Sequence, residues 1–409
     1  MVYLIFFFAA TSTLASVIPS NLHLDLGMTG REYQSLLMTR DDIEGNHELD
    51  PILKMGNRLY RWLDLINKNR PQEERLSLSS AENQPAYPID FPKVSSPKII
   101  LKNFRKLSED LPALMAKEVL GTGELSVSPP VSDQDFVYWG RKIDDLYGGA
   151  SRWILQEPML WGYAARRKTD IRGFYYLSHL PDIENHLSEW SKVSPDLKSK
   201  ITNGLMGLCL NSGEGESQCS AQFDSTLKSE GSPRSFYQTY LASGETRWNE
   251  LFLITNKRTD INWQASSQDL LTTPFQNPES ESVLKFLKDN IEDEWRWIDW
   301  KLQLNFISGG WDTTHIQFVP GATPHVNGLA GSTITMDANQ PLSEYHVRWT
   351  IRHEFGHTLG FPDCYVEFYD TKNQEMISYQ VDTSNLMCSR RGKLQEKHFE
   401  ELKRVYLKN

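Results

Sequence analysis

Two histidines stand four residues apart near the C-terminal end of this chain, a spacing that limits the local fold and its chemistry. His353-Glu354-Phe355-Gly356-His357 has the pattern H-E-x-x-H. Residues four apart on a helix share one face, so both imidazoles can reach one metal ion. Glu354 lies one step around the helix, where its carboxylate can hydrogen-bond a water instead of the metal. Flanking apolar residues predict a helix over 342–359. The sequence therefore predicts a helix that carries two metal ligands.

The residues after this helix supply a third candidate ligand. The pattern continues to Gly360 and Asp363, giving H-E-x-x-H-x-x-G-x-x-D. A glycine permits the left-handed backbone that ends a helix, and the chain can then turn back towards the metal. Asp363 offers an oxygen donor, which zinc accepts together with neutral histidine. We therefore expect one Zn(2+) ion held by His353, His357 and Asp363, with a water in the fourth position, and we assign no structural calcium site.

These residues resemble the metzincin clan of zinc peptidases. The resemblance rests on the extended motif and on Ser384-Asn385-Leu386-Met387-Cys388, which is similar to the clan's Met-turn. It covers residues 325–390 closely and 245–409 loosely. It implies that Met387 lies beneath the zinc as structural support. It also implies a substrate-binding edge strand at Gly328-Leu329-Ala330, beside a strand over 332–337.

Two positions bear on the subfamily. Asp363 stands where most of the clan has a histidine, which is similar to the snapalysin-type minority of small secreted bacterial enzymes. Ser389 stands two residues after the Met, where astacin-like and serralysin-like members have a tyrosine ligand. The resemblance implies an α+β fold, in which a twisted mixed sheet, the active-site helix, the Met-turn and a C-terminal helix form the peptidase domain.

The expected function is that of a zinc metalloendopeptidase acting on protein or peptide substrates. The metal lowers the pKa of a water, and Glu354 serves as the catalytic general base before protonating the leaving amine. The alternative is an exported non-catalytic zinc-containing binding protein or adhesin. Glu354 favours the enzyme, because a site used only for binding needs no base. A gluzincin-type site would instead take its third ligand from Glu396 or Glu400, leaving Gly360 and Asp363 as coincidences.

The four cysteines suggest two disulfides. Cys364 follows Asp363 directly and Cys388 follows Met387 directly, so a shared zinc site would bring the two sulfurs together. The alternative for this pair is two unpaired buried thiols. Cys209 and Cys219 flank a short Gly/Ser/Glu-rich loop and predict a local disulfide. One of them could instead be a thiolate that plugs the zinc site and keeps the enzyme latent.

The remaining histidines are weaker candidates. His346 lies seven residues before His353 and shares its helix face, but two turns away it is more typical of a core-edge residue than of a ligand. His325 precedes the expected edge strand and could line a cleft. His315 and His398 stand outside the motif.

The N-terminus predicts export. Val2–Ala10 is an unbroken apolar run, and Thr13-Leu14-Ala15 resembles a small-x-small cleavage site, so residues 1–15 are expected to be a signal peptide. The alternative is a buried N-terminal strand. The run is too short to span a bilayer, which needs about 20 residues. We expect a secreted or periplasmic protein with no stable membrane insertion after signal cleavage.

The chain divides unevenly. Residues 16–245 are predicted to be a mostly helical region, either a propeptide or a retained accessory domain, and residues 246–409 the peptidase domain. The 43 Lys and Arg against 53 Asp and Glu give a net charge of −10, which argues against nucleic-acid binding.

The periodicity and the turn residues predict the following segments: helices over 52–66, 111–120, 137–155 and 280–302, strands over 260–265, 315–319 and 332–336, and linkers over 83–97 and 126–130. In the long helix, Trp295, Trp297 and Trp300 are expected to pack on the sheet.

Overall fold

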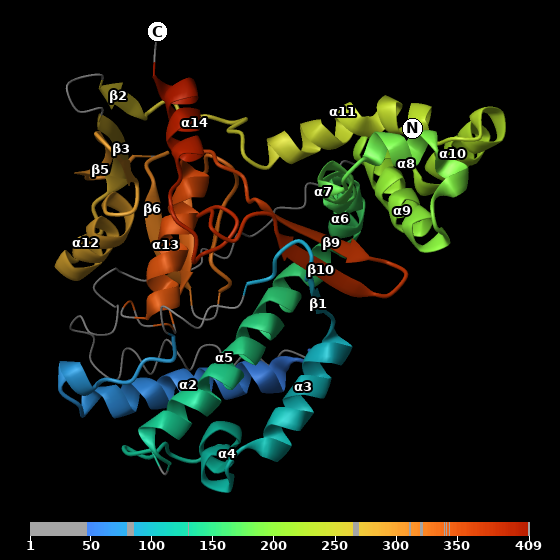
Figure 1. Cartoon of the computed structure of the whole chain (residues 1–409). Helices are drawn as coiled ribbons and strands as arrows, with labels where there is room; N and C mark the ends of the chain where they lie inside the picture. The colour runs from blue at the N-terminus through green and yellow to red at the C-terminus, as the bar shows by residue number, and fades with distance from the viewer. Residues whose placement is uncertain are drawn as a thin grey trace, which may run out of the picture.

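Helices dominate the first half of the described chain, and small sheets appear in the second half (Figure 1). The computed structural model describes residues 47–79, 86–129, 131–264, 270–310, 312–319, 322–338, 340, 342 and 344–407. The expected mixture of helices and strands is confirmed. The predicted signal peptide, residues 1–15, lies outside the described residues.

Four helices form the first layer, which lies beneath the C-terminal part in Figure 1: α2 (Asp50–Lys68), α3 (Pro97–Asp110), α4 (Ala113–Leu120) and α5 (Asp133–Gln156). Serine side chains cap two of them, because Ser96 accepts from the Ile99 N–H and Ser132 from the Asp135 N–H. Their apolar faces meet in one core around Trp62 and Phe136, whose rings meet edge to face. The helices predicted over 52–66, 111–120 and 137–155 are confirmed.

A second helical group follows and has its own core. Its core is built by α7 (Arg172–His179), α8 (Ile183–Ser188), α9 (Pro195–Asn211), α10 (Glu216–Glu230) and α11 (Arg234–Glu250), whereas the short helix α6 (Leu160–Ala165) packs against the core of the first helical layer. The predicted disulfide between Cys209 of α9 and Cys219 of α10 is present. Since the two cysteines are bonded to each other, the idea that one is a latency thiolate is wrong.

The C-terminal part contains two small sheets joined at one point. The first has the order β2 (Asn262–Gln264), β3 (Leu270–Gln276), β5 (Trp300–Ile307), β4 (Arg296–Trp297), and the second the order β6 (His315–Val319), β8 (Thr333–Asp337), β7 (His325–Val326). The backbone N–H of Gln276 donates to the Thr314 carbonyl over 2.7 Å, which links β3 to the start of β6. The parallel pairs β3–β5 and β6–β8, flanked by antiparallel β2, β4 and β7, make both sheets mixed.

The single long helix expected over 280–302 is wrong. Helix α12 spans Glu281–Leu287 and continues as a π-helical turn over Lys288–Glu292, after which the chain enters β4 and β5. Side chains of β5 alternate between buried and exposed, the period of a strand. Trp295 nevertheless packs in the core as expected, and its Nε1 donates to the Arg352 carbonyl over 3.2 Å.

A third sheet joins the two halves of the chain. Its order is β1 (Lys93–Ser95), β10 (Glu375–Gln380), β9 (Tyr365–Asp370), and all its pairs are antiparallel (Figure 1). The segment 83–97, expected as a linker, therefore contains the strand β1. Three residues of extended backbone are enough to pair at the edge of a sheet. Met376 of β10 is buried in the core of the first helical layer.

Polar contacts reinforce this connection. Glu344, the residue that precedes α13 (Tyr345–Thr358), is buried and accepts hydrogen bonds from Ser77, Leu78 and Ser79. Tyr147 of α5 donates to Asp337 of β8 over 3.1 Å. The front half of the chain thus contacts β8 and the residue that begins the helix predicted to carry the metal ligands. Among the described residues, no helix has the length and apolar character to cross a membrane.

Candidate metal site and adjoining pocket

The two histidines of the motif lie on α13 and meet Asp363 just beyond it. Oδ1 of Asp363 is 3.1 Å from Nε2 of His353 and 3.1 Å from Nε2 of His357. The three candidate ligand atoms lie within 4.8 Å of one another, and both histidines are buried. The structure therefore brings together the three residues that the sequence predicts as ligands.

A tight helix ending turns Asp363 back towards the histidines. Gly360 has φ 97°, and a β-carbon there would collide with the Asn256 carbonyl oxygen. The N–H of Phe361 then donates to the Gly356 carbonyl over 3.1 Å. A residue with a side chain at position 360 could not make this turn without strain, so the glycine of the motif has a local cause.

Backbone carbonyls orient both imidazoles. Nδ1 of His353 is 2.9 Å from the Leu386 carbonyl oxygen, and Nδ1 of His357 is 2.9 Å from the Phe361 carbonyl oxygen. Because a carbonyl can only accept, each Nδ1 carries a proton, and in the neutral imidazole each Nε2 offers its lone pair. Two such nitrogens and one carboxylate oxygen form a donor set that suits zinc.

The charges of the site are strongly coupled. Burial disfavours the charged imidazole of His357, but Asp363 outweighs burial and raises the pKa of His357 to about 9. Burial would raise the pKa of Asp363, yet the two histidines hold that pKa well below its usual range. A cation between these groups would take over the role of the His357 proton, so the donor set fits a metal ion.

The segment 384–388, the expected Met-turn, packs against α13. Met387 is buried against Gly356, which lies between the two histidines on α13. The predicted disulfide between Cys364 and Cys388 is present, with Cα atoms 4.3 Å apart, so the alternative of two free thiols is wrong. The N–H of Cys364 also donates to the Met387 carbonyl over 3.1 Å. The loop that carries Asp363 is thus fixed to the Met-turn.

Glu354 is buried beside the histidines and is only 4% exposed. Its carboxylate adds to the effect of Asp363 in raising the pKa of His357. It also acts on Arg390, whose pKa is lowered by burial while Glu354 opposes that shift. The general base expected from the sequence therefore lies within electrostatic reach of the candidate ligands.

The expected edge strand at Gly328-Leu329-Ala330 is misplaced. These residues form a turn, in which Gly328 has φ 133° and Ala330 has φ 59°, values that extended strands exclude. The strand that precedes this turn is β7, His325–Val326, which lies at one end of its sheet and pairs antiparallel with β8. The turn still abuts the site, because the N–H of Ala330 donates to the His357 carbonyl over 2.8 Å.

The other histidines have different roles. His346 is buried, burial lowers its pKa to about 4, and it is not part of the ligand group. Nδ1 of His315 is 3.1 Å from the Thr313 carbonyl oxygen. The gluzincin alternative gains no support, since the ligand group found among the described residues contains Asp363 and neither Glu396 nor Glu400.

Sequence reasoning missed the contribution of His398, on α14 (Glu396–Tyr406). Its Nδ1 accepts from the Gln395 N–H over 2.9 Å, and its Nε2 donates to Oδ1 of Asn385 over 2.8 Å. The same Asn385 oxygen accepts from the Met387 N–H over 2.7 Å. His398 therefore orders the Met-turn. The signal available in the sequence is its capping-box position, three residues after Gln395.

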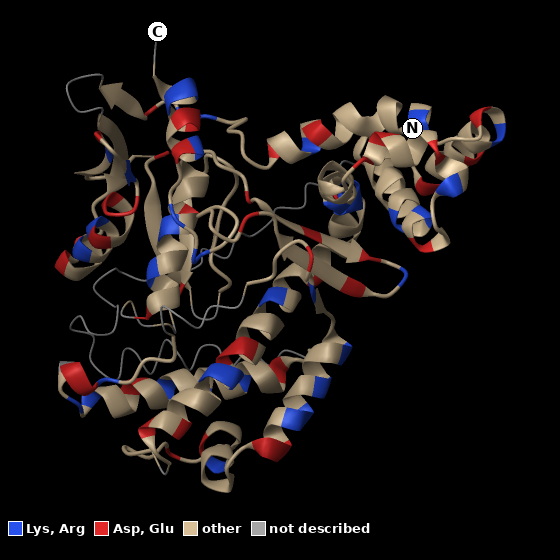
Figure 2. Ribbon diagram, viewed as in Figure 1, with Lys and Arg blue, Asp and Glu red and all other residues tan. Residues whose placement is uncertain are grey.

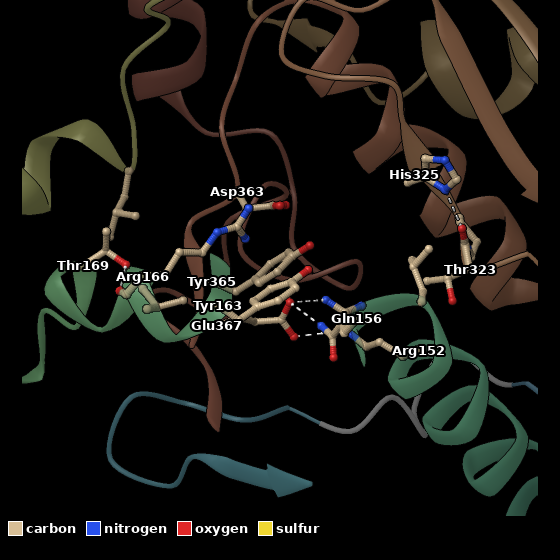
Figure 3. Close-up of a pocket in the computed structure, with 14 residues that line it drawn as sticks. Arg152, Gln156, Tyr163, Arg166, Thr169, Thr323, His325, Asp363, Tyr365 and Glu367 are labelled. Atoms are coloured by element: carbon tan, nitrogen blue, oxygen red, sulfur yellow. Dashed lines mark hydrogen bonds and ion pairs between the residues drawn. The ribbon is translucent and has the colours of Figure 1, made fainter. Parts of the chain in front are cut away.

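A pocket of about 320 Å³ opens beside Asp363 (Figure 3). Tyr365 and Glu367 of β9 form one wall, and the ring of Tyr365 stacks on His353 with ring centroids 6.1 Å apart. Another wall comes from the front half of the chain. The front-half residues that line the pocket include Arg152, Gln156, Tyr163 and Arg166. His325 of the edge strand lines it as well, as its place in the sequence suggested.

Comparison of this chain with protein-family models, with curated proteins and with solved structures finds no match.

Proposed function

We propose that this protein is an exported zinc-dependent endopeptidase of metzincin type. The observation that carries the proposal is the convergence of His353, His357 and Asp363, with both Nδ1 atoms held by carbonyls so that both Nε2 atoms face the same carboxylate oxygen. Three elements must come together to form this arrangement: the helix that carries the histidines, the turn at the glycine that ends it, and the Met-turn.

In this proposal His353, His357 and Asp363 hold the zinc ion. Zinc at such a site supplies Lewis-acid chemistry, which acidifies water and stabilises negative charge on a carbonyl oxygen. Glu354, one residue after His353 and buried beside it, takes the proton from the attacking water. The same carboxylate then delivers that proton to the leaving amine. Met387 and the Cys364–Cys388 disulfide hold the ligand loop in place.

The substrate is proposed to lie along the free side of β7. Among the described residues β7 pairs with β8 on one side and with no strand on the other, so that other side can pair with an extended peptide. The turn at 328–330 continues from β7 to the carbonyl of His357. A peptide bound to this edge would therefore lead towards the metal site.

Export is part of the proposal and rests on separate features. Two disulfides, Cys209–Cys219 and Cys364–Cys388, are typical of oxidising compartments. The apolar run at the N-terminus has the pattern of a signal peptide.

The test is hydrolysis of denatured casein by the purified protein. We expect cleavage that a zinc chelator abolishes and that added Zn²⁺ restores. Zinc binding without cleavage of any peptide would instead support the alternative of a non-catalytic binding protein or adhesin, and would overturn the proposal.

A further inference from the structure

The pocket beside Asp363 contains one positive charge that the rest of the described structure does not neutralise. Arg152 forms an ion pair with Glu367 (Figure 3). Its Nε lies 3.0 Å from Oε1 of Glu367 and its Nη2 lies 2.7 Å from Oε2, and Gln156 donates to the same carboxylate. Asp363 is engaged by the two histidines. The acidic groups of the pocket are therefore already paired.

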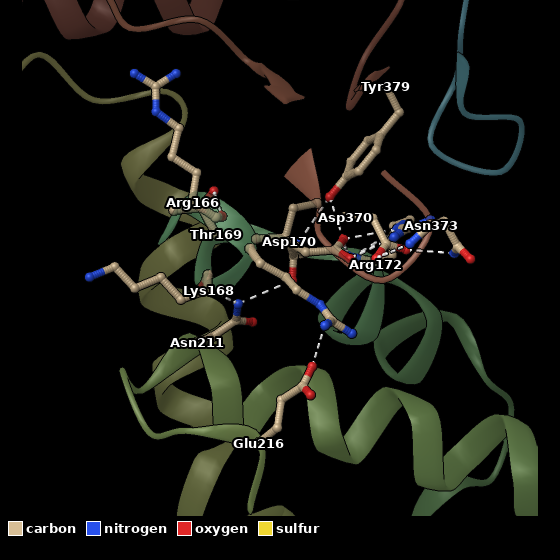
Figure 4. Close-up of polar contacts among 12 residues, drawn as sticks. Arg166, Lys168, Thr169, Asp170, Arg172, Asn211, Glu216, Asp370, Asn373 and Tyr379 are labelled. Atoms are coloured by element: carbon tan, nitrogen blue, oxygen red, sulfur yellow. Dashed lines mark hydrogen bonds and ion pairs between the residues drawn. The ribbon is translucent and has the colours of Figure 1, made fainter. Parts of the chain in front are cut away.

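Arg166 is the remaining cation. It is exposed on the turn over Arg166–Thr169, and its guanidinium lies 4.6 Å from the centroid of the Tyr163 ring, which holds it over the pocket. Among the described residues, no carboxylate forms an ion pair with it. Figure 4 shows its side chain pointing away from the polar cluster around Asp170, whereas the neighbouring Arg167 pairs with Glu216.

We propose that this pocket is a substrate subsite that accepts a carboxylate group, with Arg166 as the specificity-determining residue. The inference rests on the proposed peptidase function. The pocket shares Asp363 with the metal site, so a substrate group in it would lie next to the bond that is cleaved. Its volume of about 320 Å³ has room for an acidic side chain together with the peptide next to it, and a guanidinium pairs with a carboxylate through two parallel hydrogen bonds.

The carboxylate can come from an acidic side chain or from the C-terminus of a peptide. Three matched peptides distinguish these sources: one with Glu beside the cleaved bond and an amidated C-terminus, one with Gln there and the same amide, and the Gln peptide with a free C-terminus. We expect the full-length protein to cleave a carboxylate-bearing peptide with kcat/KM about tenfold above the amidated Gln peptide. Preference for the free-acid Gln peptide would assign the C-terminus as the source.

Substitutions at Arg166 test the residue itself. R166Q is expected to remove the preference, and R166E to transfer it to a peptide with Lys at the same position. R167Q is the matched control, because it removes an exposed neighbouring charge outside the pocket, and it should keep the wild-type preference. Equal melting temperatures for R166Q and the wild type would show that folding is unaffected.

The outcomes separate this inference from the proposed function. Cleavage with no carboxylate preference, or a preference that R166Q retains, overturns the subsite and leaves the peptidase proposal intact. Fluorescence anisotropy with the Glu354→Gln variant measures binding without turnover. Binding that depends on Arg166, with no cleavage by the wild type, supports the subsite and overturns the peptidase proposal. Neither binding nor cleavage overturns both.

Discussion

The side chain of Met387 fills the space in which a β-carbon of Gly356 would lie. Gly356 stands between His353 and His357 on α13, so the Met-turn reaches the back of the helix at the level of the candidate ligands. A β-carbon there would also come within 3.0 Å of the Trp295 ring. The absence of a side chain at this position is therefore a packing requirement of the site.

Gly356→Ala is expected to lower the free energy of unfolding by about 1–3 kcal/mol, since overpacking forces Met387 or Trp295 to move. Chemical denaturation measures the change. Gly148→Ala in α5 is the matched control: a β-carbon there meets nothing within 4 Å, and alanine stabilises an exposed helix position by up to about 1 kcal/mol. A Gly356→Ala variant as stable as the wild type would contradict the packing described here.

We expect the protein to lose stability in acid because of His398. Burial holds the pKa of His398 near 4 in the folded state, below the ordinary value of 6.5, so the unfolded chain binds the proton first. The stabilisation is complete above pH 6.5 and is lost as the pH falls towards 4. The loss is about 3 kcal/mol, at 1.36 kcal/mol for each pKa unit. Unfolding free energies measured across this pH range test the prediction.

His398→Gln should remove most of this pH dependence, because an amide can make both hydrogen bonds of the imidazole but does not titrate. Protonation of the buried His346 also lowers the stability of the protein in this pH range. His346 is present in both proteins, so its contribution cancels in the comparison. His179→Gln, at an exposed position, is the control and should keep the wild-type profile. An identical profile for His398→Gln and the wild type would exclude His398 as the cause.

The Cys364–Cys388 disulfide is expected to affect both stability and metal binding. Removing it with two serines should cost about 3 kcal/mol, because it closes a loop with a sequence separation of 24. Zinc affinity should fall too, since the bond fixes the loop of Asp363 to the Met-turn. Competition with a chromophoric chelator measures that affinity. Removing Cys209–Cys219 is the control: it should lower stability and leave zinc affinity unchanged.

The first helical layer is expected to be necessary for the fold of the C-terminal part. Strand β1 pairs with β10, Met376 is buried among the front helices, and Glu344 is held by residues 77–79. A fragment spanning 246–409 should therefore lack cooperative thermal unfolding. A fragment that folds and binds zinc would show that the front half is dispensable, as a removed propeptide would be.

The features that were predicted correctly from the sequence are those set by residues close together in the chain. The site helix, its glycine-ended turn and the approach of Asp363 follow from spacing within about ten residues. The segment 280–302 was mispredicted because α12 changes to strands without a glycine or proline to mark the change, and Ile298 supplies the left-handed turn with φ 48°.

Long-range features could not be predicted from local patterns. Arg152 and Arg166 reach the pocket only because Arg152 of α5 pairs with Glu367 of β9 and the segment after α5 packs against β9, far along the chain. Likewise the edge strand was placed three residues too late, because β7 is only two residues long and the turn after it contains Gly328. Nothing in the local sequence indicates which front-half segments line the pocket beside the candidate ligands.

Zinc content and peptide hydrolysis, measured on the same samples of the wild type and Glu354→Gln, test whether His353, His357 and Asp363 hold a zinc ion that works with Glu354. We expect one zinc per chain in both proteins and cleavage by the wild type alone, because Glu354 moves the proton but does not hold the metal. A wild type without stoichiometric zinc, or a Glu354→Gln variant that cleaves peptides at the wild-type rate, would contradict this expectation.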